Sequence, residues 1–135
     1  IVLGAGNRQH VVESGRAETV KAVVIVDMVG DRDLSVTLPR NNTPDLNAAL
    51  LAAASRLGVR EQFGLHPGGI LDDHVPFLDA GMRAADVIDF EFGTKPGRND
   101  LWHTAGDTME TLSAESLETV GRVVFDMLNA LADRE

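Results

Sequence analysis

The stretch AVVIVDMV, residues 22–29, decides the expected fold because it is rich in β-branched residues and is interrupted only by Asp27. Its apolar residues are continuous, which is typical of a strand buried on both faces in the middle of a sheet. The strand ends at Asp27, shortly before Gly30. Because catalytic groups of α/β folds often lie at the carboxyl ends of such strands, Asp27 is a first candidate site residue.

The sequence on either side predicts strands and helices that together form one α/β domain over residues 1–135. Residues 34–38 alternate with period two, which predicts a strand near the edge of the sheet. Thr43 and Pro44 begin a helix that Gly58 ends, and Ser113 caps the final helix. The other expected elements are a helix over 7–14, a short strand at Phe63 in a loop over 62–70, a short helix through Leu78 that Gly81 ends, and a strand over 84–92.

Composition narrows the classes of partner. Twelve basic and 21 acidic residues give a net charge of −9, which repels phosphate groups, so nucleic acid and anionic membrane surfaces are not expected partners. No apolar run approaches the roughly 20 residues of a membrane-spanning helix. The chain has no Cys, so a metal site would need His and carboxylate ligands.

Candidate site residues gather in two short segments, LDDHVPF at residues 71–77 and WHTAGDT at residues 102–108. His103 follows the only Trp, which would restrict its rotamers and partly exclude water, as suits a metal ligand. Asp27 would be a costly buried charge unless it is hydrogen-bonded or near a cation. The plainer interpretation of Asp27 is a turn or a helix cap.

Plainer interpretations also exist for the other polar residues. One residue of the pair Asp72-Asp73 is expected to cap the helix that follows. His74 fits a surface position slightly better than the role of a residue that contacts a metal ligand without binding the metal itself. His10 and His66 have no supporting pattern and are expected at the surface.

A different class of function is indicated at the start of the chain. Gly4-Ala5-Gly6 follows an apolar run, and Asp27 closes a strand 21 residues after Gly6, which resembles a dinucleotide-binding unit. Gln9 stands where that motif needs its third glycine. A nucleotide-binding module therefore remains an alternative, as does a fragment with only a structural or interaction role.

Taken together, VDMVGD at 26–31, DDHVPFL at 72–78 and WHT at 102–104 with Asp107-Thr108 resemble the zinc aminopeptidases and glutaminyl cyclases of metallopeptidase family 28. The resemblance implies a three-layer α/β sandwich of the phosphorylase/hydrolase-like type, with a mixed, largely parallel sheet and zinc at the carboxyl ends of its strands. It makes His103 a zinc ligand. Asp27 would bind a second zinc in the aminopeptidases, or hydrogen-bond the catalytic carboxylate in the one-zinc cyclases.

The resemblance favours the cyclase branch, with the N-terminus of a peptide or protein as substrate. Asp72 matches the first Asp of the cyclase motif, where it joins a hydrogen-bond network with the catalytic acid, whereas many aminopeptidases have Ser there. Trp102 before His103 is also cyclase-like and is assigned to substrate binding. The alternative remains a two-zinc aminopeptidase that hydrolyses the first peptide bond.

The family's remaining zinc ligands and its acid/base Glu have no counterpart in the sequence, which contains no Glu-Glu pair. The resemblance therefore implies a catalytic domain that lacks its N-terminal part, so that this chain alone would bind zinc weakly and be inactive. An exposed sheet edge would then favour self-association. The resemblance also implies a secreted or periplasmic location.

Overall fold

The computed structural model describes residues 15–133. The expected helix over 7–14 and the glycine-rich turn at Gly4 to Gln9 lie outside these residues. The helices and strands are, in order, η1 (Arg16–Thr19), β1 (Val23–Asp27), β2 (Val36–Leu38), α2 (Pro44–Arg56), η2 (Arg60–Gln62), β3 (Phe63–Leu65), α3 (Val75–Asp79), β4 (Ala84–Asp89), η3 (Met109–Thr111) and α4 (Ala114–Ala132).

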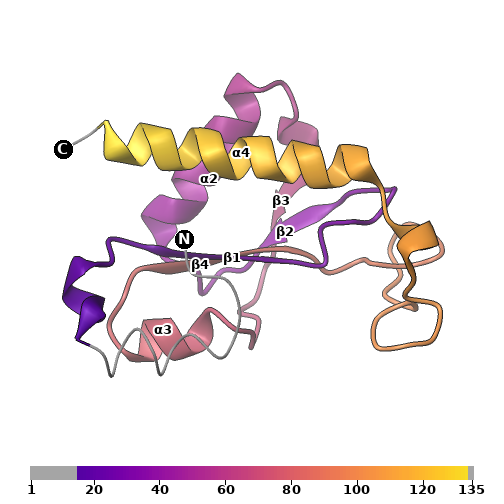
Figure 1. Ribbon diagram of the computed structural model, residues 1–135, viewed down its shortest axis with the longest axis horizontal. Helices are drawn as coiled ribbons and strands as arrows, with labels where there is room; N and C mark the ends of the chain where they lie inside the picture. Colours follow the sequence, from indigo (N-terminus) through magenta and orange to yellow (C-terminus); the bar gives the residue numbers. More distant parts are fainter. Residues whose placement is uncertain (1–14, 134–135) are drawn as a thin grey trace.

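A four-stranded sheet with the order β1-β4-β2-β3 forms the middle layer of the described chain. β1 and β4 are parallel, β2 and β3 are parallel, and β2 runs antiparallel to β4. Helices α2 and α4 cover one face of the sheet and α3 lies on the other (Figure 1). The expected three-layer α/β sandwich with a mixed, largely parallel sheet is therefore confirmed.

β1 contributes to a hydrophobic core on each face of the sheet, because successive side chains of a strand point to opposite faces. Val24 packs in the larger core with α2 and α4, whereas Val23 and Ile25 pack with Phe77 of α3 on the other face. The continuous apolar run in the sequence reflects this double coverage, so the expectation of burial on both faces is confirmed.

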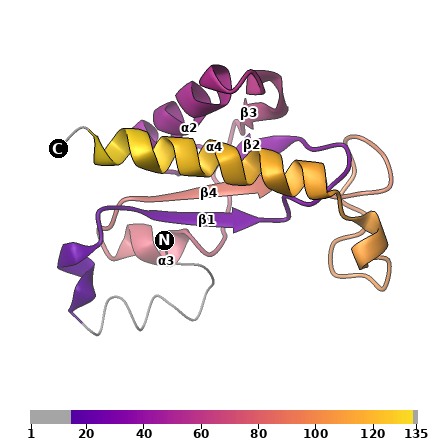
Figure 2. The ribbon, with the colours of Figure 1, turned by 45° about the horizontal axis from the view of Figure 1, so that its top comes forward.

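The expected positions of two strands in the sheet were wrong for the described residues. β1 lies at one end of the strand order and not in the middle, whereas β2 lies between β4 and β3 and not at an edge (Figure 2). The physical reason is that apolar patterning reports how well the two faces of a strand are covered. It does not report how many strands lie beside it.

The ends of the helices follow the sequence signals, with one difference in detail. Ser113 caps α4 by accepting a hydrogen bond from the Ser116 backbone N–H. Thr43 precedes α2 as expected, but its hydroxyl oxygen accepts from the Ala84 backbone N–H and so ties the start of the helix to β4. The short strand at Phe63 is confirmed, and β4 ends at Asp89, before the expected residue 92.

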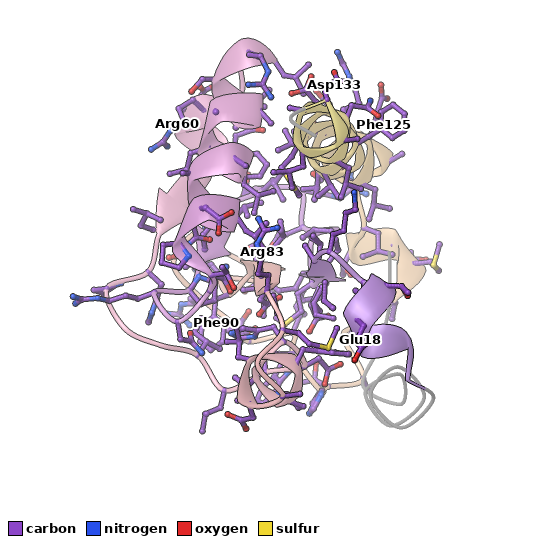
Figure 3. The ribbon with its side chains drawn as sticks, turned by 90° about the vertical axis from the view of Figure 1, so that its left-hand side faces the viewer. Glu18, Arg60, Arg83, Phe90, Phe125 and Asp133 are labelled. Atoms are coloured by element: carbon purple, nitrogen blue, oxygen red, sulfur yellow. The ribbon has the colours of Figure 1, made fainter. Side chains whose placement is uncertain are left out.

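The outer face of α4, defined by Leu117, Gly121 and Phe125 at intervals of four residues, remains exposed. Leu117 is 47% and Phe125 66% exposed. Phe125 projects from the side of α4 that is turned away from α2 (Figure 3). Among residues 15–133, no helix has the length and apolar character needed to cross a membrane.

Candidate active site

A cleft of about 570 Å³ opens at the carboxyl ends of β1 and β4 and brings the expected site residues together. Asp27 ends β1 and lies opposite Ile88 of β4, since the two parallel strands end at the same edge of the sheet. Asp72, Trp102 and His103 reach the same cleft from two loops. Residues from three distant parts of the sequence therefore meet where the resemblance placed a site.

Asp27 is a half-buried carboxyl group at the base of this cleft. Burial raises its pKa above the ordinary value, and the neighbouring Asp72 carboxylate raises it further. The Met28 backbone N–H acts in the opposite direction by hydrogen-bonding the charged form, and His103 also lowers the pKa. Met28 itself has a φ of 56°, an uncommon conformation for a side chain of this size, and it turns the backbone sharply just after Asp27.

Asp72 is held in place by a loop that Asn41 clamps to the end of β2. The Asn41 side chain donates to the Ile70 carbonyl and accepts from the Ile70 N–H, both at 2.9 Å. Asp72 then accepts a hydrogen bond from the Asp73 N–H at 2.7 Å. The expectation that one of these two carboxylates caps α3 was wrong, because His74 occupies the N-cap position and no side chain there bonds the helix.

Trp102 and His103 lie in a tight turn that the Thr104 N–H closes on the Leu101 carbonyl. His103 has a φ of 55°, which His adopts more readily than most residues, and its ring stacks on Trp102 with centroids 4.1 Å apart. Trp102 remains 51% exposed. The indole can therefore both orient the imidazole and offer an apolar wall to a ligand.

The described residues supply part of the donor set of a zinc site. Asp27 and His103 are a carboxylate and an imidazole, the ligand types that zinc takes in proteins without cysteine. Within residues 15–133, however, no group of three or more His, Asp or Glu side chains is arranged to hold a metal. These residues fit zinc as partial ligands, and a complete site needs further donors.

Beside these carboxylates lies a pair of ionisable residues, His74 and Asp86, whose side chains are fully buried. His74 Nδ1 and Asp86 Oδ2 are 3.8 Å apart, too far for a hydrogen bond. None of the four side-chain polar atoms has a hydrogen-bond partner within residues 15–133. Burial lowers the pKa of His74 and raises the pKa of Asp86 to about 8, with the Asp72 and Asp27 charges adding to the latter. Burial therefore favours the neutral form of both groups.

Buried Asn42 fixes the backbone around Asp86. Its side-chain amide donates to the Asp86 carbonyl and to Asn47 Oδ1, and its oxygen accepts from the Asp86 N–H, at 2.8 to 2.9 Å. Asn47 in turn donates to the Pro39 carbonyl at 3.0 Å. This network joins the start of α2 to β4 below the cleft.

Several residues around the site were missed or misplaced by sequence reasoning. His74 was expected at the surface and is buried, and His66 was also expected at the surface but is half-buried and lines the cleft. Asp86 was not singled out, although a carboxylate inside the apolar run of residues 84–88 was a usable signal. Ile70 and Phe90 contribute apolar side chains to the lining of the cleft, and no sequence motif had singled them out.

Comparison with known proteins agrees with this geometry. A family model, "Peptidase family M28", matches residues 3–128. Similar solved structures include a glutaminyl cyclase from an Acidobacteriales bacterium, at 30% identity and a TM-score of 0.85 over 97% of this chain and 45% of that one. Another is the glutaminyl cyclase of Porphyromonas gingivalis, at 26% identity and a TM-score of 0.75 over 92% of this chain and 48% of that one.

A zinc aminopeptidase from Bacillus subtilis, BSAP, shares the fold at 24% identity and a TM-score of 0.70, over 95% of this chain and 33% of that one. A search of curated proteins found no match. The chain spans less than half the length of these three structures. Because the family model covers nearly all of its residues, the chain belongs to peptidase family M28.

Proposed function

We propose that this chain is part of a zinc-dependent enzyme that acts on the N-termini of peptides by glutaminyl cyclase chemistry. The observation that carries the proposal is the convergence of Asp27, Asp72, Trp102 and His103 on one cleft. The likeness to two glutaminyl cyclase structures at 26–30% identity supports the same branch of the family.

In this reaction the α-amino nitrogen of an N-terminal Gln bonds to its own side-chain carbonyl carbon, the bond to the amide nitrogen breaks, and ammonia leaves. A proton must move from the attacking amine to the leaving nitrogen. Asp27 and Asp72 suit a hydrogen-bond network for that transfer, because burial and mutual repulsion raise the pKa of Asp27. In this proposal the acid/base residue itself is a Glu outside the chain.

His103 would hold zinc, and Asp27 would either join the proton network or serve as a second ligand. Zinc, when bound, polarises a carbonyl oxygen of the substrate. The exposed Trp102 ring would pack against the substrate side chain and limit its access to water. We propose that residues upstream of Ile1, or a second chain, complete the ligand set.

Aminopeptidase activity is the second candidate, and the position of Asp27 favours it. The nearby His103 lowers the pKa of this carboxyl group, so the two side chains lie near each other, as two ligands of a paired metal site would. In that case a metal-activated water would attack the first peptide bond, and any N-terminal residue with a suitable side chain would be released.

The two candidates differ in their products. The protein extended upstream and loaded with zinc is given Gln-peptides and Leu-peptides, and released ammonia and released amino acids are measured separately. The cyclase proposal expects ammonia from Gln-peptides only, and Asp72→Asn should lower kcat by about 10²-fold or more. Asp79→Asn, an exposed carboxylate at the end of α3, is the matched control and should change neither product. Release of free amino acids from both peptides would favour the peptidase.

A further inference from the structure

A second hollow, which we call the β3 groove, lies next to the candidate active site. It has a volume of about 600 Å³ and is lined mainly by Ala48, Leu51, Leu65 and Pro67. Among the described residues that line it, Arg40 is the only Lys or Arg. The groove runs between α2 and β3, the strand at the end of the sheet opposite β1. The groove and the active-site cleft share the side chain of His66 as a common wall.

The exposed apolar surface of this groove has no structural explanation within the described chain. Leu65 is 60% exposed although it follows the buried Phe63 in the same strand. Exposed apolar surface in a concave site commonly marks a place where a ligand binds. Arg40, which is exposed at the groove, forms no ion pair or side-chain hydrogen bond with any residue in 15–133, so its charge is free to meet an acidic group.

The wall between the two hollows is locally rigid. His66 Nδ1 accepts a hydrogen bond from the Gly68 N–H at 3.1 Å, and the imidazole lies 6.3 Å from the Phe90 ring on the cleft side. A peptide whose first residue lies in the cleft must continue outward. Because His66 lines both hollows, the β3 groove is the hollow beside the cleft into which those next residues can extend.

We propose that the β3 groove binds the second to fourth residues of the peptide substrate, with an apolar side chain against Leu51 and Leu65 and an acidic group at Arg40. This inference rests on the proposed function in one respect, namely that the substrate is a peptide whose N-terminal residue occupies the cleft. On this proposal, the groove determines which peptide N-termini the enzyme selects as substrates. The ligand class is a Gln-initiated peptide with an apolar residue followed by an acidic one.

The test compares two substrates of the zinc-loaded extended protein, Gln-Ala amide and the tetrapeptide Gln-Ala-Leu-Asp. The tetrapeptide should have a kcat/KM about tenfold or more above that of the dipeptide. The difference should come from a lower KM, since burying one apolar side chain strengthens binding by about that factor. Leu65→Ser should bring the ratio of the two values close to one. Arg40→Gln should lower the kcat/KM ratio of tetrapeptide to dipeptide only when the tetrapeptide carries the acidic residue.

Leu117→Ser, which changes another exposed leucine on the outer face of α4, is the matched control and should leave the ratio as in the parent. Equal KM values for the two substrates in the parent, or an unchanged ratio in Leu65→Ser, would overturn the proposal.

A binding measurement separates failure of this proposal from failure of the proposed function. The tetrapeptide is titrated into ¹⁵N-labelled protein, and shifts of the Ala48, Leu51 and Leu65 amide signals are recorded. Shifts at these residues without turnover would retain the groove as a peptide site and reject the proposed chemistry. Turnover without shifts at these residues, together with an unchanged kcat/KM ratio in Leu65→Ser, would reject the groove as a peptide site.

Discussion

The strongest single consequence of the structure concerns the buried carboxyl group of Asp86. Its side chain has no hydrogen-bond partner among the described residues, and burial raises its pKa from an ordinary 3.8 to about 8. The folded chain therefore keeps a proton on Asp86 between about pH 4 and pH 8, whereas the unfolded chain has released it. By linkage, this group makes the folded state lose stability as the pH rises through that window.

The magnitude follows from the pKa difference. About four pKa units, at about 1.36 kcal/mol per unit, correspond to a loss of roughly 6 kcal/mol between pH 4 and pH 8 if the site stays rigid. Asp86→Asn replaces the carboxyl group with a neutral group of the same shape. The variant should match the parent near pH 4 and be more stable than the parent at pH 8, by up to that amount.

The assay is urea unfolding followed by circular dichroism at several pH values from 4 to 8, with EDTA present to keep the site metal-free. Asp79→Asn, at an exposed carboxylate, should reproduce the pH dependence of the parent. The contrary result is a variant that is less stable than the parent at pH 7 by roughly 3–5 kcal/mol, because that would mean that Asp86 and His74 form a charged pair. Parallel pH profiles of variant and parent would also refute the reasoning.

Three further predictions concern stability and association. Asn42→Ala should cost roughly 2–4 kcal/mol in urea unfolding, since it removes three buried hydrogen bonds, two to the Asp86 backbone and one to Asn47. A loss below about 1 kcal/mol would show that water replaces them. Gly93→Ala should destabilise the loop that leads to the site, because the added Cβ would clash with the backbone carbonyl of Arg98; an unchanged melting temperature would contradict this. We also propose that the 135-residue chain self-associates through the outer face of α4 and the edge of β1 that pairs with no strand in residues 15–133. Light scattering should then show dimers or larger species that the double change Leu117→Ser and Phe125→Ser reduces, whereas a clean monomer in the parent would refute the idea.

The sequence predicted the layers of the fold well because they depend on local signals. The continuous apolar run of β1 predicts a strand that is covered on both faces. The capped, amphipathic sequence of α4 predicts a helix that is covered on one face. The order of strands depends on which edges pair, and no local pattern records that. For this reason β1 and β2 exchanged their expected positions.

The residues of the candidate site likewise fall into those that local motifs predict and those that only the fold brings together. Asp27, Asp72, Trp102 and His103 were predicted from motifs, and the structure brings all four to one cleft. The closeness of His74 to Asp86 could not be predicted, because it depends on where α3 packs against β4. The place of His66 in the linings of two hollows could not be predicted for a similar reason, since only the fold brings it there.

We propose above all that His103 belongs to a zinc site at which N-terminal Gln is cyclised. The most direct measurement is ammonia release from a Gln-peptide by the zinc-loaded protein extended upstream, with and without the change His103→Ala. The account predicts steady release by the parent and a loss of at least about 10³-fold in the variant, with zinc content reduced as well. Equal activity and equal zinc content in the two proteins would contradict it.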